Sequence, residues 1–249
     1  GSAVTDLTTT ATPEGDGWRI NGVKVFQTHA SVAEMMLTYV RFGPGIGGIG
    51  SVLIERDTPG FSISEPSNFM SGEQWCQLYF ENCRIPASQR LGAAGEGFKL
   101  AMRTLDVFRT SVAAAALGFA RRALHESIAW ARSRKMFGQS LGDFQITQTK
   151  IAQMATMLDA ATLLTYRAAW LRDQGGRITR EAAMDKMTAT ENAQQIIDMA
   201  VQMHGGMGVK KGVMVESLYR EIRALRIYEG ASDVQRVVIA RSILPKEAL

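Results

Sequence analysis

The hydrophobic pattern of this 249-residue chain changes near residue 95, and this change constrains the fold more than any other feature. Residues 1–94 consist of short apolar segments separated by turn residues, which is typical of antiparallel strands. Residues 95–249 contain long stretches with apolar residues at three-and-four spacing, which indicates helices. We therefore predict an α+β protein, with a small antiparallel β domain of barrel or sandwich type over residues 1–94 and a four-helix-bundle-type domain over residues 95–249.

One hairpin and several further strands are expected in the first part. Asn21-Gly22 separates two alternating segments, and Asn-Gly in that position is the strongest short-range signal of a hairpin turn. The glycine-rich residues 43–50 lack the lysine and the serine or threonine of a phosphate-binding loop, so we expect a flexible connection there. The predicted strands cover residues 18–20, 23–26, 36–42, 51–55, 61–64 and 77–85.

The second part is expected to form long helices that pack closely. The predicted helices cover residues 98–135, 143–173, 179–203, 214–222 and 232–243. In the third helix, small and apolar residues recur at Ala189, Ala193, Ile196, Ala200 and Met203. Small side chains in such a seam favour a close approach between neighbouring helices.

Composition excludes two classes of partner. The longest apolar run, residues 112–120, is far too short to cross a membrane. The net charge is +4, but Lys and Arg are scattered rather than clustered, so we do not expect nucleic-acid binding.

Cys76 and Cys83 are the only cysteines, and on one extended strand they would point to opposite faces. No structural disulfide is expected, which favours a reducing compartment: the cytoplasm, or the mitochondrial matrix in a eukaryote.

Glu229 is the leading candidate for acid–base chemistry. It lies between Tyr228 and Gly230, after an apolar pair and ahead of a new helical pattern. A carboxylate on an apolar turn is disfavoured as an anion, so its pKa should rise toward the range of a general base. The alternative is that Glu229 belongs to the N-terminus of the helix beginning near Ser232 and complements its dipole.

Two connections between the predicted helices suit phosphate groups. One contains Arg134 and aromatic residues, which can bind a phosphate and stack on a planar base. The other contains Gly205-Gly206, whose backbone N–H groups can approach a pyrophosphate closely. His204 stands beside these glycines without a second ligand at a metal-like spacing, so we predict no metal site.

Five elements, in this order, resemble the acyl-CoA dehydrogenase family. They are Asn21-Gly22-x-Lys24 with Phe26-Gln27-Thr28; Asp106-x-x-Arg109; Arg134-Lys135-x-Phe137-Gly138 with Phe144-Gln145; Gln202-x-x-Gly205-Gly206; and Tyr228-Glu229-Gly230-x-Ser232 with Gln235-Arg236. A typical member has an N-terminal helical domain before its β domain. This chain begins within the β domain, so we expect that helical domain to be absent from it and the chain to be a fragment or half of a split enzyme.

The resemblance implies an activity. It identifies the chain as an FAD-dependent oxidoreductase of fatty acid and lipid metabolism that introduces an α,β double bond into an acyl-CoA thioester. Glu229 matches the base that removes the α proton while a hydride leaves the β carbon for flavin N5. The resemblance also implies an electron-transfer flavoprotein as acceptor and a homodimer or homotetramer. It does not indicate the length or branching of the acyl chain.

The resemblance also assigns binding residues. Those that match the family's FAD-binding positions are Phe26, Gln27, Thr28, Arg134, Lys135, Met136, Phe137, Phe144, Gln145, Gln202, His204, Gly205, Gly206, Ala231, Ser232 and Asp233. Those that match substrate-binding positions are Ser2, Asp106, Arg109, Tyr228 and Gly230.

Departures from the family pattern leave two alternatives open. Some members place their base just before the helix arginine, and here Phe108 occupies that position, which leaves Glu229 as the family-type base. Phe26 replaces a tryptophan, and Met136 and Ala231 replace threonines, so we expect weakened FAD binding. The alternatives are a flavin oxidase or monooxygenase on the same fold, and a non-catalytic assembly partner that keeps the fold.

Overall fold

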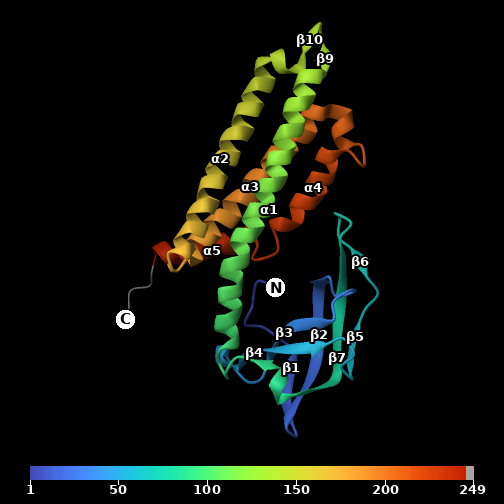
Figure 1. Cartoon of the computed structure of the whole chain (residues 1–249), viewed down its shortest axis with the longest axis vertical. Coiled ribbons are helices and arrows are strands. Elements are labelled where there is room, and N and C mark those ends of the chain that lie inside the picture. The colour runs from blue at the N-terminus through green and yellow to red at the C-terminus, as the bar shows by residue number, and fades with distance from the viewer. Residues whose placement is uncertain (245–249) are drawn as a thin grey trace. The chain divides into compact units, whose positions relative to one another are not determined.

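The computed structural model describes residues 1–244 and confirms the α+β organisation (Figure 1). The chain divides into two compact units, Gly1–Arg103 and Thr104–Leu249, which are described separately below. None of the helices in the described range is both long enough and apolar enough to cross a membrane.

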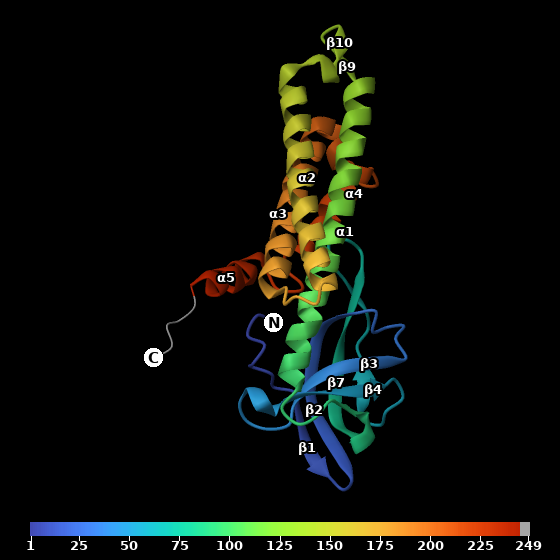
Figure 2. The same cartoon turned by 60° about the vertical axis from the view of Figure 1, so that its left-hand side comes forward.

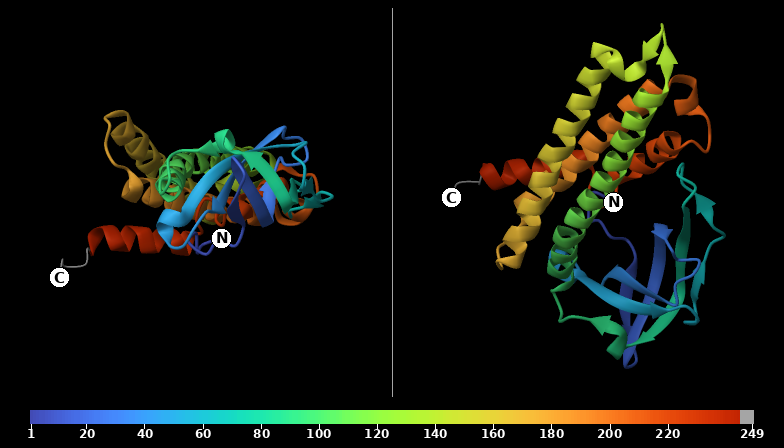
Figure 3. Two further views of the ribbon diagram at one scale, coloured as in Figure 1. Left: turned by 90° about the horizontal axis from the view of Figure 1, so that it is seen from below. Right: turned by 45° about the horizontal axis from the view of Figure 1, so that its top comes forward.

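The first unit is built on a sheet of eight strands within the described residues (Figure 3). The strands are β1 (Thr10–Glu14), β2 (Gly17–Thr28), β3 (Met35–Arg41), β4 (Ile49–Glu55), β5 (Phe61–Ile63), β6 (Ser67–Asn68), β7 (Gln74–Pro86) and β8 (Arg90–Leu91). Their order is β5-β7-β2-β1-β3-β4-β8, with β6 beside β7. Neighbours are antiparallel, except that β1 and β3 meet in parallel at Thr10 and Arg41. Short 3₁₀ helices, η1 (Ile46–Gly48) and η2 (Ala87–Gln89), precede β4 and β8, so a helical turn lies within the glycine-rich loop expected to be a flexible connection.

The predicted hairpin at Asn21-Gly22 is wrong, because β2 runs straight through this pair. The chain turns earlier, at Gly15-Asp16, where Glu14 pairs with Gly17. Asn21-Gly22 instead lies at a bulge, where the pairing of β2 with β7 shifts register. The Asn21 side-chain oxygen accepts a 2.7 Å hydrogen bond from the Asn82 backbone N–H. The left-handed preference of Asn-Gly is therefore used to form a bulge instead of a turn.

The expectation that Cys76 and Cys83 face opposite sides of the sheet is also wrong. Both are free thiols on β7 and both are buried in the core of the first unit. Glu81 and Asn82 are two consecutive exposed residues, and Asn82 has φ 51°. This irregularity shifts the alternation of buried and exposed side chains along β7 by one position. Burial raises the pKa of the Cys83 thiol to about 11, so this thiol is unreactive at neutral pH.

The second unit is a helical bundle whose predicted helices are confirmed to within a few residues (Figure 2). The helices are α1 (Gly97–Ser133), which enters this unit at Thr104, α2 (Gln145–Asp173), α3 (Thr179–His204), α4 (Met214–Leu225) and α5 (Ser232–Ile243). The elements β9 (Lys135–Met136), β10 (Gln139–Ser140), η3 (Leu141–Asp143) and η4 (Gly205–Val209) lie between them. The first three run side by side, and α4 and α5 both pack against α3.

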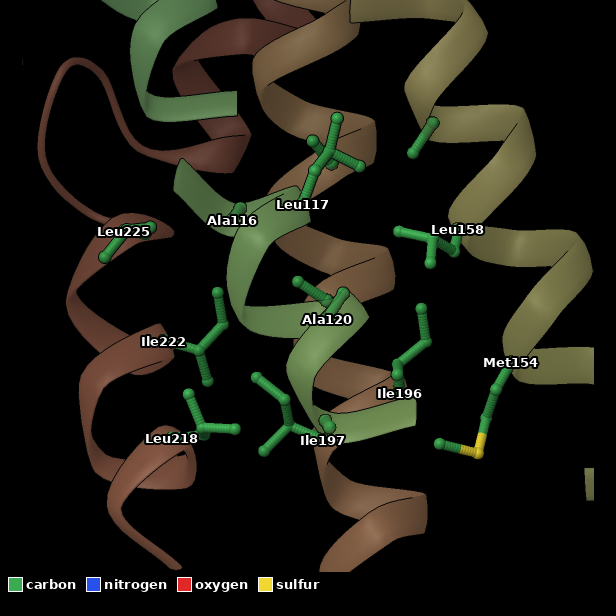
Figure 4. Packing of buried hydrophobic residues seen from close by; sticks show 14 of the residues in the cluster. Ala116, Leu117, Ala120, Met154, Leu158, Ile196, Ile197, Leu218, Ile222 and Leu225 are labelled. Atoms are coloured by element: carbon green, nitrogen blue, oxygen red, sulfur yellow. The ribbon is translucent and has the colours of Figure 1, made fainter. Parts of the chain in front are cut away.

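Small residues allow these helices to approach closely (Figure 4). Ala116 and Ala120 of α1 are buried in one cluster with Ile196 and Ile197 of α3 and with Leu158 of α2. The predicted seam on α3 is confirmed for its first four members, which are fully buried, while Met203 packs against the edge of the cluster. This core fixes the axial register of α1 and α3, and both helices carry charged residues that meet near Glu229.

Candidate functional site

Glu229 lies in the short connection between α4 and α5, outside any helix. It therefore does not belong to the first turn of α5, which begins at Ser232. Glu229 has φ 55° and Gly230 has φ 89°, so two consecutive residues are in the left-handed region. A non-glycine residue in this region costs about 1–2 kcal/mol, and the surrounding structure must hold it there.

Three buried side chains from three helices hold this turn through its carbonyl groups. Arg109 of α1 donates through Nε to the Glu229 carbonyl at 3.3 Å. Gln235 of α5 donates through Nε2 to the carbonyls of Glu229 and Gly230, at 3.0 and 2.9 Å. Lys186 of α3 donates through Nζ to the Gly230 carbonyl at 2.9 Å. We call Arg109, Lys186 and Gln235 the carbonyl clamp; their exposed fractions are 5%, 0% and 0%.

The clamp fixes the backbone of Glu229 but leaves its carboxyl group available. Oε2 of Glu229 is buried and makes no hydrogen bond within the described residues. Burial raises the pKa of Glu229, and the charges of Arg109 and Lys186 offset this only in part. A half-buried carboxyl group that has one oxygen without a hydrogen bond and a raised pKa is suited to take up and release a proton.

Arg109 and Asp106, predicted to contact substrate, are engaged inside the second unit. Arg109 Nη1 forms an ion pair with Asp106 Oδ1 at 3.2 Å, and the Thr179 hydroxyl donates to Asp106 Oδ2 at 2.6 Å. These contacts link the first residue of α3 to the helical turn of α1 that carries Arg109. Asp106 therefore helps to hold the side chain of Arg109, a member of the carbonyl clamp, in place.

A second buried carboxyl group, Asp185, precedes Lys186 on α3. Burial raises the pKa of Asp185 to about 7, although the Thr110 hydroxyl, the Lys186 amide and the Arg109 charge oppose this. Neither carboxyl oxygen makes a hydrogen bond of ordinary geometry within the described residues. The clamp therefore adjoins a carboxyl group that is close to half-ionised at neutral pH.

Of the residues after Gly230, Ser232 is buried and contacts another helix, whereas Asp233 is exposed. The Ser232 hydroxyl donates to Glu191, which also forms an ion pair with Arg226 at 2.8 Å. Burial acts to raise the pKa of Glu191, but the hydrogen bonds from Ser232 and Arg226 outweigh it and the pKa is lowered. Asp233 is exposed and pairs with Arg236 at 2.6 Å. Ser232 thus closes the end of the Glu229 turn, while Asp233 faces outward.

Ala231 occupies the N-cap position of α5 and makes no side-chain cap. Its φ of −56° and ψ of 153° suit a capping residue, so a hydroxyl placed there can accept from a free N–H of the first turn. We expect Ala231→Ser to stabilise the folded protein by about 0.5–2 kcal/mol, measured by thermal or urea unfolding. Ala231→Val adds bulk without an acceptor and is the matched control; equal stability of the two variants would refute the cap.

The two phosphate-suited connections lie at one end of the bundle. The ring of Trp130, in the last turns of α1, stacks on His204 with centroids 5.0 Å apart. His204 Nδ1 lies 2.7 Å from the Ala200 carbonyl oxygen, which fixes the imidazole. Phe137 is 87% exposed and contacts the ring of Phe144, with centroids 6.4 Å apart. Residues 134–145 and 202–206 therefore adjoin the same surface, beyond the ends of α1 and α3.

The backbone at this end is open to a ligand. A side chain added at Gly205 or Gly206 would meet no atom within 4 Å. Helix α2 begins after Phe144 with no side-chain cap, which leaves amide groups of its first turn for an anion. Lys135 and Met136 form β9, which pairs with β10 in a small hairpin.

The Glu229 turn and this end of the bundle are far apart. Arg109, which contacts Glu229, and Trp130, which contacts His204, lie on the continuous helix α1, 21 residues apart. At 1.5 Å per residue, this separation is about 30 Å. One copy of the chain therefore presents a proton-transfer site and a phosphate-suited site at different ends of α1.

In the first unit, Phe26 is presented on an aromatic surface. Phe26 has φ 57° and is 62% exposed, and its ring lies 4.7 Å from Trp75 and 6.3 Å from Phe69. Gln27 donates to the Val25 carbonyl at 2.8 Å. Thr28, at the end of β2, pairs with Trp75. The remaining substrate-position residues Ser2 and Tyr228 are exposed.

Sequence reasoning missed several of these residues. Lys186 and Asp185 were not singled out, although the flanking Ala182, Ala183 and Ala189 indicate a helix face that is buried. Gln235 was recognised only as part of a motif, without a role. Trp75 and Phe69 were missed as neighbours of Phe26, because their contacts depend on the pairing of β7 with β2 and with β6.

Two family models together account for most of the chain. The acyl-CoA dehydrogenase C-terminal domain matches residues 95–244, and the acyl-CoA dehydrogenase middle domain matches residues 1–83. The chain belongs to the acyl-CoA dehydrogenase family.

Individual proteins resemble the chain over almost its whole length. The human short-chain specific mitochondrial acyl-CoA dehydrogenase is 40% identical and matches 98% of this chain and 60% of its own length. The caffeyl-CoA reductase-Etf complex subunit CarC of Acetobacterium woodii is 39% identical, over 99% of this chain and 66% of its own length. The solved structure of PigA with FAD and proline is 30% identical, with a TM-score of 0.94, over 98% of this chain and 64% of its own. The chain thus spans less than two thirds of each of these relatives.

Proposed function

We propose that this chain carries the proton-transfer and FAD-binding residues of an enzyme that oxidises an acyl-CoA thioester to its α,β-unsaturated form. The observation that carries the proposal is the Glu229 carboxyl group: its Oε2 is buried and makes no hydrogen bond within the described residues, and it stands on a turn held by three helices. The human relative, an acyl-CoA dehydrogenase, supports the substrate class.

The residues present fit FAD. Phe26, with Trp75 and Phe69 behind it, offers an exposed aromatic surface to a flat ring system. Arg134 and the open backbone at Gly205 and Gly206 suit a pyrophosphate. The relative solved with FAD supports this assignment. FAD, when bound, supplies the acceptor for the hydride that leaves the substrate.

Glu229 performs the proton chemistry. Its ionised carboxyl group removes the proton next to the thioester carbonyl, and its pKa, raised by burial, makes it a stronger base than an exposed glutamate. The clamp holds the Glu229 and Gly230 carbonyls, so the backbone does not move as the carboxyl group changes charge. The backbone N–H of Glu229, as the family resemblance implies, donates to the thioester oxygen and stabilises the developing negative charge.

The reverse reaction is a second candidate. CarC is a caffeyl-CoA reductase subunit, and the same carboxyl group that removes an α proton can return one. The raised pKa of Glu229 favours this direction as well, because the protonated acid is present at a higher pH. Which direction predominates depends on the redox partner, and the name of CarC supports an electron-transfer flavoprotein in that role.

The separation of the two sites supports a homo-oligomer. The Glu229 turn and the Gly205-Gly206 end lie about 30 Å apart along α1. A second copy of the chain could bring its own Gly205-Gly206 end to the Glu229 turn of the first copy, so that residues of both copies would hold one FAD. We therefore propose a dimer, or a tetramer of such dimers, in which two copies share each FAD site.

The proposal is tested by flavin absorbance. We expect the purified chain, reconstituted with FAD, to be yellow and to bleach anaerobically when a saturated acyl-CoA is added. Bleached protein should regain its colour with an α,β-unsaturated acyl-CoA if the reverse reaction operates. Oxygen consumption without another acceptor would favour an oxidase. Protein that stays colourless with added FAD would contradict the proposal and favour a non-catalytic assembly partner.

A further inference from the structure

Lys186 is an unusual residue for the interior of a helical bundle. It is fully buried on α3, where lysine is rarely found without a partner. Its ammonium group donates a 2.9 Å hydrogen bond to the Gly230 carbonyl, next to the candidate base. An exposed position would avoid the cost of taking an ammonium group out of water, so the contact with the Glu229 turn needs an explanation.

Charged groups from three directions face Lys186. Burial lowers the pKa of Lys186 to about 8, the carboxyl groups of Glu229 and Glu191 oppose this, and the guanidinium of Arg109 adds to it. Asp185 precedes Lys186 on the same helix and is also buried. At neutral pH most of the Lys186 population is therefore cationic, and Glu229 is one of the two anions that stabilise that charge.

We propose that Lys186 is a positioning residue for Glu229, holding the Gly230 carbonyl so that the left-handed turn keeps its shape and supplying a counter-charge when the carboxyl group ionises. This inference rests on the proposed function for its effect on rate, but the contact itself does not depend on that function. It gives a buried lysine two linked roles on one turn, one through a hydrogen bond and one through charge.

The other clamp residues cannot replace Lys186. Gln235 contacts both carbonyls from α5, but its amide carries no net charge. Arg109 is charged, but it donates to the Glu229 carbonyl and is partly neutralised by Asp106. Without Lys186, the Gly230 carbonyl keeps one donor and Glu229 loses one of two nearby cations.

Lys186→Met and Lys186→Gln separate the two roles. Methionine keeps an unbranched side chain of similar length but removes both the donor and the charge, whereas glutamine keeps an N–H donor and removes only the charge. In both variants the pKa of Glu229 should rise, because an opposing charge has been removed. In a protein labelled with ¹³C at the Glu side-chain carboxyl carbon, the Glu229 signal, assigned by its loss in Glu229→Gln, should titrate at higher pH than in the unsubstituted protein.

Kinetics give the second readout. In the FAD-loaded chain, the rate of flavin reduction by acyl-CoA at pH 7 should fall by about tenfold or more in Lys186→Met, with little change in the acyl-CoA concentration at half-maximal rate. The rising limb of the pH profile should move to higher pH in both variants. Lys186→Gln should lose less rate than Lys186→Met at high pH, where Glu229 is ionised in each.

A matched core substitution separates positioning from stability. Ile197→Val lies on the same helix, is fully buried, and removes one methylene without touching the turn. It should lower the melting temperature but leave the Glu229 titration and the pH profile unchanged. An unshifted Glu229 signal in both Lys186 variants would overturn the inference. A shifted signal in a chain whose flavin no acyl-CoA reduces would uphold the contact while rejecting the proposed function.

Discussion

Glu229→Gln should lower the rate of flavin reduction by acyl-CoA by about 10²- to 10⁴-fold, the range by which a general base accelerates proton transfer. Glutamine has the same shape, but its amide cannot accept the α proton. The carbonyl clamp contacts only backbone atoms of residue 229, so the turn should keep its conformation. The measurement is anaerobic stopped-flow absorbance at saturating acyl-CoA, with flavin content measured on the same samples.

The control for this variant is Glu126→Gln on α1. Glu126 forms a surface ion pair with Arg122 at 2.7 Å, and such pairs contribute little to stability or function. The reduction rate of Glu126→Gln should equal that of the unsubstituted chain. If Glu229→Gln reduces its flavin at an undiminished rate, the proton is taken by another group and the assignment of the base is wrong.

The helices were predictable because their signals are local. Proline is absent from α1, Gly175-Gly176 follow the end of α2, and small residues recur along α3 at helical spacing. Each of these signals acts within a few residues, so no knowledge of the neighbouring elements was needed. The helix ends agree with the structure to within a few residues for this reason.

The β unit was less predictable because its local signals have two uses. Asn21-Gly22 tolerates left-handed backbone in a turn and in a bulge, and the choice depends on β7, which lies more than 50 residues away in the sequence. The same bulge places the two cysteines on one side of the sheet. Asn82, which lies between them on β7, bonds to Asn21 there and interrupts the regular alternation of the strand. A pattern of period two predicts which side of the sheet a residue faces only while the strand remains regular.

The site was predicted in part. Glu229 was found from its sequence context, but the clamp that holds it was not. Lys186 and Asp185 are polar residues in a helix, and their burial follows from the packing of α1 and the Glu229 turn against α3. Such tertiary burial has no signal within a few residues of sequence, apart from the alanines that flank the pair.

Asp185→Asn should stabilise the folded protein above pH 8, where the buried carboxyl group of the unsubstituted chain is ionised. The pKa of Asp185 is raised by burial to about 7, against about 3.9 in an unfolded chain. The folded state therefore binds more protons than the unfolded state between about pH 4 and 7, and the stability contributed by the protonated group is lost as the pH rises through 7. Asparagine resembles the protonated acid and does not titrate, so the gain at pH 8 should reach about 4 kcal/mol at most.

The pH dependence distinguishes a gain that comes from removing the buried charge of Asp185 from a general improvement in packing. The stability difference between Asp185→Asn and the unsubstituted chain should be small near pH 4, grow up to about pH 7 and stay constant above pH 8, as measured by urea unfolding at each pH. Asp198→Asn, on the exposed side of the same helix, should give a difference close to zero throughout. A gain for Asp185→Asn that does not change with pH would show that the pKa of Asp185 is the same in the folded and unfolded states, so that burial does not raise it.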